Sequence, residues 1–504
     1  MKKTIFTLLA ASATLVNYAQ QKNSLLDQNF WKNKPSVEQI KTEIANGNNP
    51  SASNDRSFDV VVMAINNDAS TETILFLLQQ PGNDVNKPTH DNRIYLHWAA
   101  NKGNTAVVKY LIDHGSDINA EDSHATTPII FAASSGQKNT EIYDLFFKKG
   151  LDPKKKYKDG ANLLLLAIAN DKDLNLTTYF TTKGLSLKDT DAKGRTAFDY
   201  AARNGNIDFL KLLASKNVKA TDNALLLAAQ GSRRDANGLD VFRYLLDDTK
   251  LKPTATTENG ETVLHLVANK PKQSEIINYF IGKGVDVNKA DNEGTTALTI
   301  AAGNRDTEAL EVLIGKTKNV NTKNEKGISA LTLAVAEGSS KAVEILLQQG
   351  ADINVLDSKQ NNLGYYLVQS YKPERGGRGP QGGMNTPTED PFQSKMSLLQ
   401  QKGLNLATPQ KDGNTLYHFA ILKNDIALLK KFAPLHIDVN AKNNDGLTVL
   451  HKAAMIAKDD ATLKYLLSIG AKKEVTTDFD ESVYALAKEN ETLTKRNISI
   501  EFLK

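Results

Sequence analysis

The chain has 504 residues, 40% of them hydrophobic and 24% charged, and its formal net charge is +4. This composition suffices for a continuous buried core, whereas a charge so close to neutral excludes a dedicated nucleic-acid binder, which needs a strongly basic face. The sequence contains no cysteine, which excludes disulfides, thiolate metal sites and a lipid anchor on a modified cysteine.

The first nineteen residues are typical of a secretory signal peptide. Lys2 and Lys3 precede an apolar run at 5–16, and Ala19 offers a small residue at the cleavage site. No later stretch reaches the ~18 consecutive apolar residues of a membrane-spanning helix. We therefore expect cleavage near Ala19 or Gln20, a mature net charge of +2, and a soluble protein exported to a bacterial periplasm or released outside the cell.

Residues 20–56 are predicted to cap the N-terminal end of the repeat array that follows them. The segment 25–45 has the pattern of capping helices, and its apolar side chains include Phe30, Trp31, Ile40 and Ile44. Such side chains would cover the hydrophobic face that the first repeat of a stack leaves exposed.

A degenerate motif recurs along residues 57–490. Its clearest copy is 294–302, and further copies begin at Gly194, Gly260, Gly327, Gly413 and Gly446. The glycines at 260, 294 and 327 are 34 and 33 residues apart, and a fixed period near 33 indicates a solenoid of small stacked units. A solenoid presents an extended surface, so binding becomes the leading functional hypothesis.

Each copy predicts two helices and a turn. The first helix is expected to begin after a residue whose side chain can cap its free amides, and small Ala pairs let the two helices approach closely. The apolar residues of the second helix form one buried stripe, and the Gly after it suits a left-handed backbone. The capping positions are Ile94, Thr127, Asn162, Thr196, Asn223, Thr262, Thr296, Ser329, Asn362, Thr415, Thr448 and Ser482.

These motifs resemble the ankyrin repeat family, whose unit reads Asp-x-x-Gly-x-Thr-Pro-Leu-His-x-Ala-Ala and closes on Gly-Ala-Asp-Val-Asn. The closing turn is present at 284–288 and 350–354, whereas the Pro survives only at Pro128. The resemblance implies an all-α ankyrin repeat solenoid of about 12 helix-turn-helix units with short β-hairpin fingers. The family's His recurs at His97, His265, His418 and His451.

Two insertions and the C-terminal end depart from the period. Residues 232–238 lie between the helices of one repeat, and the 86 residues from Gly327 to Gly413 exceed two periods by 20, which matches the segment 372–391. Its Gly and Pro content predicts a flexible loop, either a tolerated insertion or a contact with a partner. Residues 489–504 are predicted to form a closing helix, with 491–504 as the C-terminal cap.

The sequence shows none of the usual catalytic motifs: it has no Gly-x-Ser-x-Gly, His-Glu-x-x-His or Gly-x-x-x-x-Gly-Lys. We therefore expect no enzyme activity, cofactor or metal. His90 and His124 are 34 residues apart, which places them on neighbouring fingers. Two histidines without a carboxylate cluster make a poor metal site.

Three functions remain open from the sequence. The first is a monomeric scaffold that binds another exported protein through its concave face; the second is a small-ligand or metal carrier using His90 and His124; the third is a hydrolase with the loop 372–391 as a lid. The family's contact positions are the fingertips, the residue before the capping position and the end of the first helix. The resemblance assigns them to Arg93, Asn101, Lys102, Tyr157, Lys158, Arg195, Arg203, Asn204, Glu261, Asn269, Lys270, Thr295 and Asn304. The expected central patch is Arg93, Lys102, Tyr157, Lys158, Arg195 and Arg203.

Overall fold

The computed structural model describes residues 23–232, 236–373 and 390–504, and within these ranges every regular element is a helix. The predicted signal peptide and most of the 372–391 insertion lie outside the described residues. Contacts within the chain divide it into two units. Unit 1 holds the residues up to 201 together with 211–219, and unit 2 holds 202–210 and 220–504.

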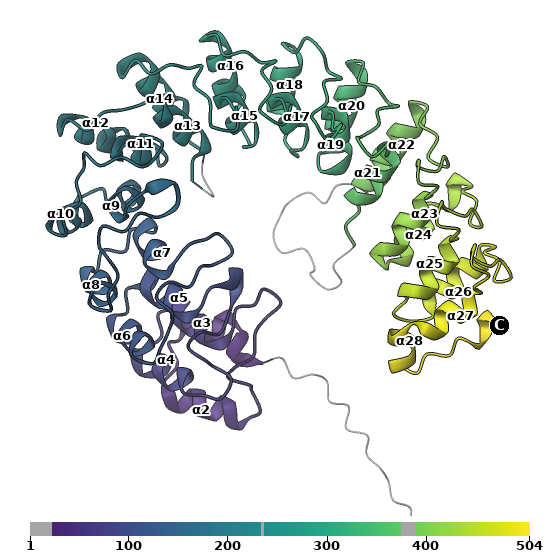
Figure 1. The fold of residues 1–504 in the computed structure, drawn as a ribbon, viewed down its shortest axis with the longest axis horizontal. Coiled ribbons are helices and arrows are strands. Elements are labelled where there is room, and N and C mark those ends of the chain that lie inside the picture. Colours follow the sequence, from purple (N-terminus) through teal and green to yellow (C-terminus); the bar gives the residue numbers. More distant parts are fainter. Residues whose placement is uncertain (1–22, 233–235, 374–389) are drawn as a thin grey trace, which may run out of the picture. The chain divides into compact units, whose positions relative to one another are not determined.

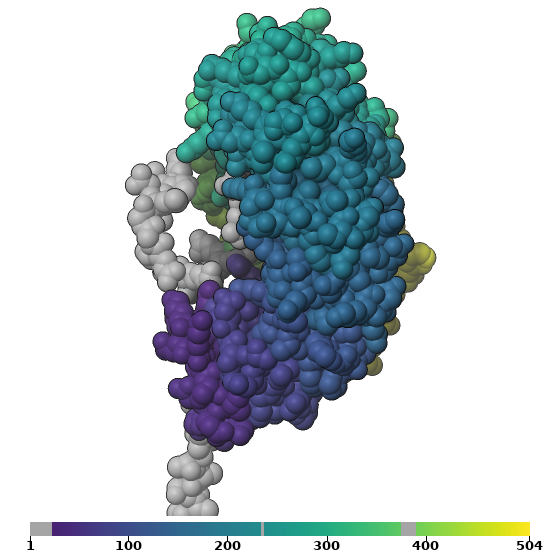
Figure 2. All heavy atoms as spheres, turned by 90° about the vertical axis from the view of Figure 1, so that its left-hand side faces the viewer, coloured from purple at the N-terminus to yellow at the C-terminus, as the bar shows by residue number. Residues whose placement is uncertain are grey.

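Unit 1 consists of helix pairs that follow one another in chain order. Its purple and blue atoms in Figure 2 accordingly lie in the order of the sequence. The odd-numbered helix of each pair from α3 onward lies in one row and its even-numbered partner in a second row (Figure 1). The helices are α1 (Gln28–Lys32), α2 (Val37–Ala45), α3 (Val60–Asn66), α4 (Thr71–Leu78), α5 (Tyr95–Lys102), α6 (Thr105–Asp113), α7 (Pro128–Ser134), α8 (Thr140–Lys148), α9 (Leu163–Ala167), α10 (Asn175–Thr182) and α11 (Ala197–Ala202).

Unit 2 repeats the same arrangement, with α13, α15, α17, α19 and α21 forming its inner row (Figure 1). The division between the units falls within α11 and α12 (Ile207–Ser215). The remaining helices are α13 (Asn223–Gln230), α14 (Leu239–Arg243), α15 (Val263–Ala268), α16 (Ser274–Gly282), α17 (Ala297–Ala302), α18 (Glu308–Ile314), α19 (Ala330–Ala336), α20 (Ser340–Gln348), α21 (Leu363–Ser370), α22 (Pro391–Gln401), α23 (Leu416–Ala420), α24 (Ile426–Lys431), α25 (Val449–Ile456), α26 (Ala461–Ser468), α27 (Val483–Glu489) and α28 (Glu491–Lys495).

The predicted helix starts are confirmed at eleven of the twelve capping positions, where the helix begins on the next residue. The exception is Asn223, which is the first residue of α13, because the hydroxyl of Thr221 accepts the Asn223 backbone N–H at 3.2 Å. The structure contains one further repeat, formed by α3 and α4, whose capping residue Asp59 was not identified from the motif. The described residues therefore contain thirteen helix pairs from α3 to α28, one more than the twelve positions identified from the motif.

The family histidines join consecutive repeats. The Nδ1 atom of His265 accepts the Thr262 backbone N–H at 3.1 Å, and its Nε2–H donates to the carbonyl of Thr295 in the next repeat at 3.1 Å. Because Nδ1 accepts an N–H, the imidazole is the neutral form with its proton on Nε2. Burial lowers the pKa of His265, although the hydrogen bond to Thr295 opposes the shift. The other three histidines make the same pair of contacts: His97, His418 and His451.

The fingers in the described residues are turns without strands, and isolated bridges close four of them. Such bridges occur, for example, between Thr256 and Thr262 and between Ala290 and Thr296. Neighbouring fingers are also joined directly, because the Asn292 N–H donates to the carbonyl of Asn259 at 2.8 Å. In the described residues, turns thus replace the expected β-hairpins.

The two ends differ in how closely they follow the prediction. At the N-terminal end, Trp31 is fully buried and its Nε1–H donates to the Leu25 carbonyl at 2.8 Å. At the C-terminal end, a single closing helix over 489–504 is wrong. α28 ends at Lys495, Asn497 adopts a left-handed φ of 53°, and only the short 3-10 helix Glu501–Leu503 follows.

The insertion lies between the two helices of one repeat, as predicted, because α21 precedes it and α22 begins at Pro391. Directly after it, Lys395 is 4% exposed at a position where α20 carries Ala342. Its Nζ donates to the carbonyl of Val335, at the C-terminal end of α19, at 2.9 Å. In other repeats a side-chain amide donates this hydrogen bond to the end of the inner helix. Asn304, for example, donates to the carbonyl of Ala268 at the end of α15.

The buried Lys395 gives a prediction for alkaline pH. Burial, and next the charges of Lys372 and Arg305, lower the pKa of Lys395 to about 8. Between about pH 8 and 10 the folded state therefore binds fewer protons than the unfolded state, so its stability rises with pH. From pH 8 to pH 10, the free energy of unfolding measured with urea should rise by about 1–3 kcal/mol more for the wild type than for Lys395→Met. A difference between the two proteins that stays constant with pH would contradict the buried position of the ammonium group.

Candidate partner-binding groove

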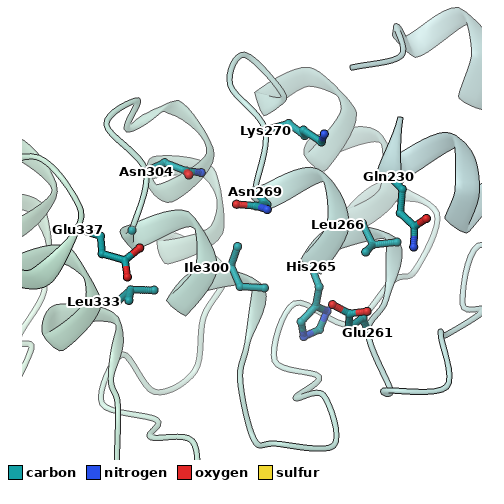
Figure 3. Close-up of a pocket in the computed structure, with 11 residues that line it drawn as sticks. Gln230, Glu261, His265, Leu266, Asn269, Lys270, Ile300, Asn304, Leu333 and Glu337 are labelled. Carbon is teal, nitrogen blue, oxygen red and sulfur yellow. The ribbon is translucent and has the colours of Figure 1, made fainter. Parts of the chain in front are cut away.

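A groove of about 390 Å³ runs across the inner helices of unit 2. Four consecutive inner helices contribute to it: α13, α15, α17 and α19. Figure 3 shows the side chains that line it, which come from corresponding positions of successive repeats. The repeat itself therefore builds the groove, because each unit adds one copy of the same inner face.

The floor of the groove is apolar. Leu266, Ile300 and Leu333 each lie four residues after the residue that caps their helix, and they form one row in Figure 3. All three side chains are half-buried. Because residues at equal helical positions point in the same direction, stacking the repeats aligns the three side chains into a stripe.

The rim of the groove is polar, with charges of opposite sign at its two ends. Lys270, Asn304 and Glu337 each lie eight residues after their capping residue, from α15 to α19. The Nζ of Lys270 donates to the Ser232 carbonyl at 3.3 Å, whereas Glu337 is exposed. Between these ends, Asn269 presents an exposed amide. An apolar stripe bordered by amides, by Lys270 and by the carboxylates of Glu261 and Glu337 suits a polypeptide segment better than a small reactive molecule.

The structure gives Arg93 an internal role. Its guanidinium contacts Asp91 at 3.1 Å and Asp122 in the next finger at 2.8 Å, and it lies over the rings of Trp98 and Phe131. Its side chain is only 11% exposed. A guanidinium already held by two carboxylates and two rings has few atoms to offer a partner.

Arg195 repeats this arrangement from the opposite side. It contacts Asp191 of its own finger at 2.5 Å and Asp159 of the preceding finger at 2.9 Å, with 16% of its side chain exposed. Tyr157 is also turned inward: its hydroxyl is buried, and burial raises its pKa. Three of the six residues of the predicted central patch are thus turned inward: Arg93, Tyr157 and Arg195.

The remaining predicted residues lie nearer the surface. Lys102 forms an ion pair with Asp68 at 2.9 Å, Lys158 is exposed, and Asn101 and Asn204 are half-buried. In unit 2, the Nη2 of Arg203 donates to Gln230, one of the groove residues, at 3.1 Å. Of the predicted contacts, the groove brings together Glu261, Asn269, Lys270 and Asn304.

The two histidines of neighbouring fingers, His90 and His124, each contact different residues. The Nδ1 of His90 lies 2.8 Å from the Arg56 carbonyl and its ring stacks on Phe58, whereas His124 lies 4.0 Å from Asp122. The described residues contain no group of three side chains that could hold a metal ion.

Comparison with known proteins identifies the repeat. A family model described as ankyrin repeats (3 copies) matches residues 61–157, 137–224 and 264–357, together more than half of the chain. The chain belongs to the ankyrin repeat family. Ankyrin repeats are a protein-binding scaffold, so this chain carries a surface for protein partners. None of the helices in the described ranges has the length and apolar character that a membrane crossing requires.

Similar ankyrin repeat regions occur in proteins of different kinds. The human transient receptor potential cation channel subfamily A member 1 is 30% identical over 42% of this chain and 19% of its own length. A putative ankyrin repeat protein of Acanthamoeba polyphaga mimivirus is 27% identical over 42% of this chain and 31% of its own. A palmitoyltransferase of Lachancea kluyveri is 35% identical over 25% of this chain and 18% of its own. The chain thus spans less than a third of each of these relatives.

Proposed function

We propose that this ankyrin repeat protein is a non-catalytic scaffold that binds another exported protein through the groove of unit 2. The observation that carries the proposal is the apolar floor of Leu266, Ile300 and Leu333, which is half-buried but accessible along three successive repeats and is bordered by polar side chains. Apolar side chains that remain accessible in a concave, polar-rimmed surface are typical of a binding site. Lys270 and Asn304, predicted as contacts from the sequence, belong to the rim.

Export is part of the proposal and has its own test. The signal-peptide pattern of residues 1–19 supports a location outside the cytoplasm, in the periplasm or beyond the cell, and a chain without cysteine is compatible with such an oxidising compartment. Mass spectrometry of the protein purified from its native source should find a chain that begins near Gln20 or Gln21. Native protein that still carries Met1 would contradict export by cleavage.

The binding function is tested by a substitution in the floor. Ile300→Asp places a carboxylate in the apolar stripe, and we expect capture of the partner from the extracytoplasmic fraction to fall at least about tenfold, which corresponds to about 1.4 kcal/mol. Ile300 is half-buried at the surface of α17, so circular dichroism and melting should stay close to the wild type. Glu311→Lys on the exposed face of α18 is the matched control and should bind as the wild type does. Equal capture by the wild type and Ile300→Asp would overturn the proposal.

A further inference from the structure

We infer that the groove of unit 2 receives an extended segment of its partner in which every third residue is apolar. The inference rests on the proposed function, because it specifies the form of the segment bound at the same groove. It follows from three properties of the groove: the spacing of its floor, the amides of its rim and the positions of its charges.

The spacing of the floor matches a polyproline II segment. Leu266, Ile300 and Leu333 lie on consecutive inner helices, and packed helices have axes about 8–10 Å apart. A polyproline II chain has three residues per turn and rises 3.1 Å per residue, so every third side chain returns to the same face after about 9 Å. In a β-strand, side chains return to the same face after about 6.7 Å, which does not match the spacing of about 8–10 Å between the floor side chains.

The spacing of the floor also disfavours a helix. A helix brings a side chain back to the same face after one turn, about 5.4 Å, which is well short of the distance of about 8–10 Å between neighbouring floor side chains. An extended chain is also narrower than a helix, whose width is about 10–12 Å, and only its apolar side chains need to enter the groove.

The amides of the rim suit a chain without internal hydrogen bonds. A polyproline II segment leaves its backbone carbonyls, and any N–H groups, without internal partners. Asn269 is exposed beside the floor, and among the described residues its side chain has no hydrogen-bond partner. An Asn amide both donates and accepts, so it can serve either backbone group of the segment.

The rim charges add a second requirement. Lys270 and Glu337 occupy the same helical position two repeats apart. At three segment residues per repeat, their partners lie six residues apart and have opposite charge. The rim thus selects a segment of about nine residues with three apolar side chains, an acidic residue opposite Lys270 and a basic residue opposite Glu337. Glu261 also lines the groove, and its carboxylate further favours a basic residue in the segment.

The test uses twelve-residue fluorescent peptides and the full purified chain in anisotropy titrations. The probe carries Leu at every third position, with Pro and Gln elsewhere, and one Asp and one Lys six residues apart. We expect it to bind at least about tenfold more tightly than a peptide of equal composition with Leu at every second position. It should also bind more tightly than an Ala-rich, helix-forming peptide with Leu at i, i+3, i+4 and i+7. Ile300→Asp should abolish binding, and Glu311→Lys should leave it unchanged.

The second part of the test reverses a charge on the groove, and its outcome does not depend on the direction of the bound chain. A diacidic peptide, with Asp at both charged positions, should bind the wild type less tightly than the mixed peptide. Glu337→Lys should reverse this order, and Glu337 is exposed, so the variant should remain folded.

Equal binding of the helix-forming or alternating peptide, or no reversal in Glu337→Lys, would overturn the inference. If no peptide of the set binds although Ile300→Asp still abolishes capture of the partner protein, the inference fails and the proposed function stands. If Ile300→Asp leaves both kinds of binding intact, the groove is not the site and both fail.

Discussion

Removing residues 294–326, one full period, should leave unit 2 folded and soluble, whereas removing 294–306 should make it aggregate. The full-period deletion joins two equivalent points of neighbouring fingers. Gly294 and Gly327 both have a left-handed backbone, with φ of 83° and 76°. The carbonyls of Glu293 and Lys326 each accept a hydrogen bond from the next finger, at 2.8 and 2.9 Å. The junction therefore preserves the contacts between repeats.

The shorter deletion removes α17 but keeps α18. Leu310 and Leu313 of α18 are fully buried in the intact chain, and loss of the partner helix would expose them. Exposing two leucines costs about 3–6 kcal/mol, and contacts with α15 and α19 are lost as well. Circular dichroism and size-exclusion chromatography distinguish the two products. Equal tolerance of both deletions would contradict the period assigned to the repeat.

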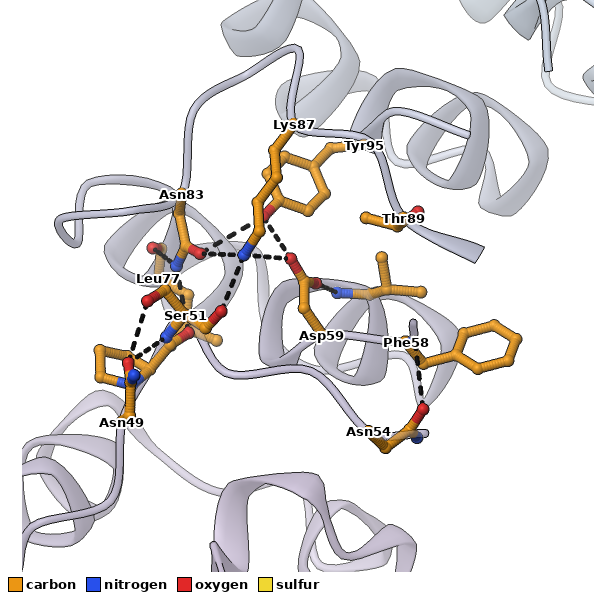
Figure 4. Close-up of polar contacts among 12 residues, drawn as sticks. Asn49, Ser51, Asn54, Phe58, Asp59, Leu77, Asn83, Lys87, Thr89 and Tyr95 are labelled. Atoms are coloured by element: carbon orange, nitrogen blue, oxygen red, sulfur yellow. Dashed lines mark hydrogen bonds and ion pairs between the residues drawn. The ribbon is translucent and has the colours of Figure 1, made fainter. Parts of the chain in front are cut away.

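Asp59→Ala should destabilise unit 1 by about 2–4 kcal/mol, because it removes a buried carboxylate that caps a helix and accepts from a tyrosine hydroxyl and a half-buried lysine. Asp59 is 1% exposed and its Oδ2 contacts the Nζ of Lys87 at 2.9 Å and the hydroxyl of Tyr95 at 2.5 Å (Figure 4). Its Oδ1 also accepts the Val62 N–H at the start of α3. The substitution thus removes a helix cap and the carboxylate that Lys87 and Tyr95 share. Both donors then keep only the side-chain oxygen of Asn83, and Lys87 also keeps the Ser51 carbonyl.

Matched variants separate these contributions in urea unfolding experiments. Tyr95→Phe removes a single hydroxyl and should cost about 1–2 kcal/mol. Combining Asp59→Ala with Lys87→Met removes both charges and should recover part of the loss. A cost below about 1 kcal/mol for Asp59→Ala would show that the buried pair contributes little to the repeat.

The helix starts were predictable because each depends on a local signal. Thr296, for example, caps α17 with its own hydroxyl, and no distant contact is needed. The repeat after Asp59 escaped the motif because Ser57 takes the left-handed position, with φ of 58°, that Gly260 takes in another repeat. Asp caps a helix as well as Thr does, so a broader pattern would have found this repeat.

The candidate site was predictable only in part. The family's contact positions led to Lys270 and Asn304 at the rim, but they also led to Arg93 and Arg195. The burial of these two arginines depends on carboxylates of adjacent fingers, which no single repeat reveals. The floor carries a sequence signal after all, because Leu266 and its counterparts always lie four residues after the capping residue. That position is apolar in many repeats for reasons of packing, and only the structure shows which of these side chains remain accessible.

Site-specific photo-crosslinking in living cells tests the groove as the binding surface most directly. A photo-reactive amino acid in place of Ile300 should give a covalent adduct with one extracytoplasmic protein, because this position lies in the centre of the groove floor. The same amino acid in place of Glu311, on the exposed face of α18, should give no adduct. Crosslinking from position 311 and none from position 300 would contradict the groove as the site of partner binding.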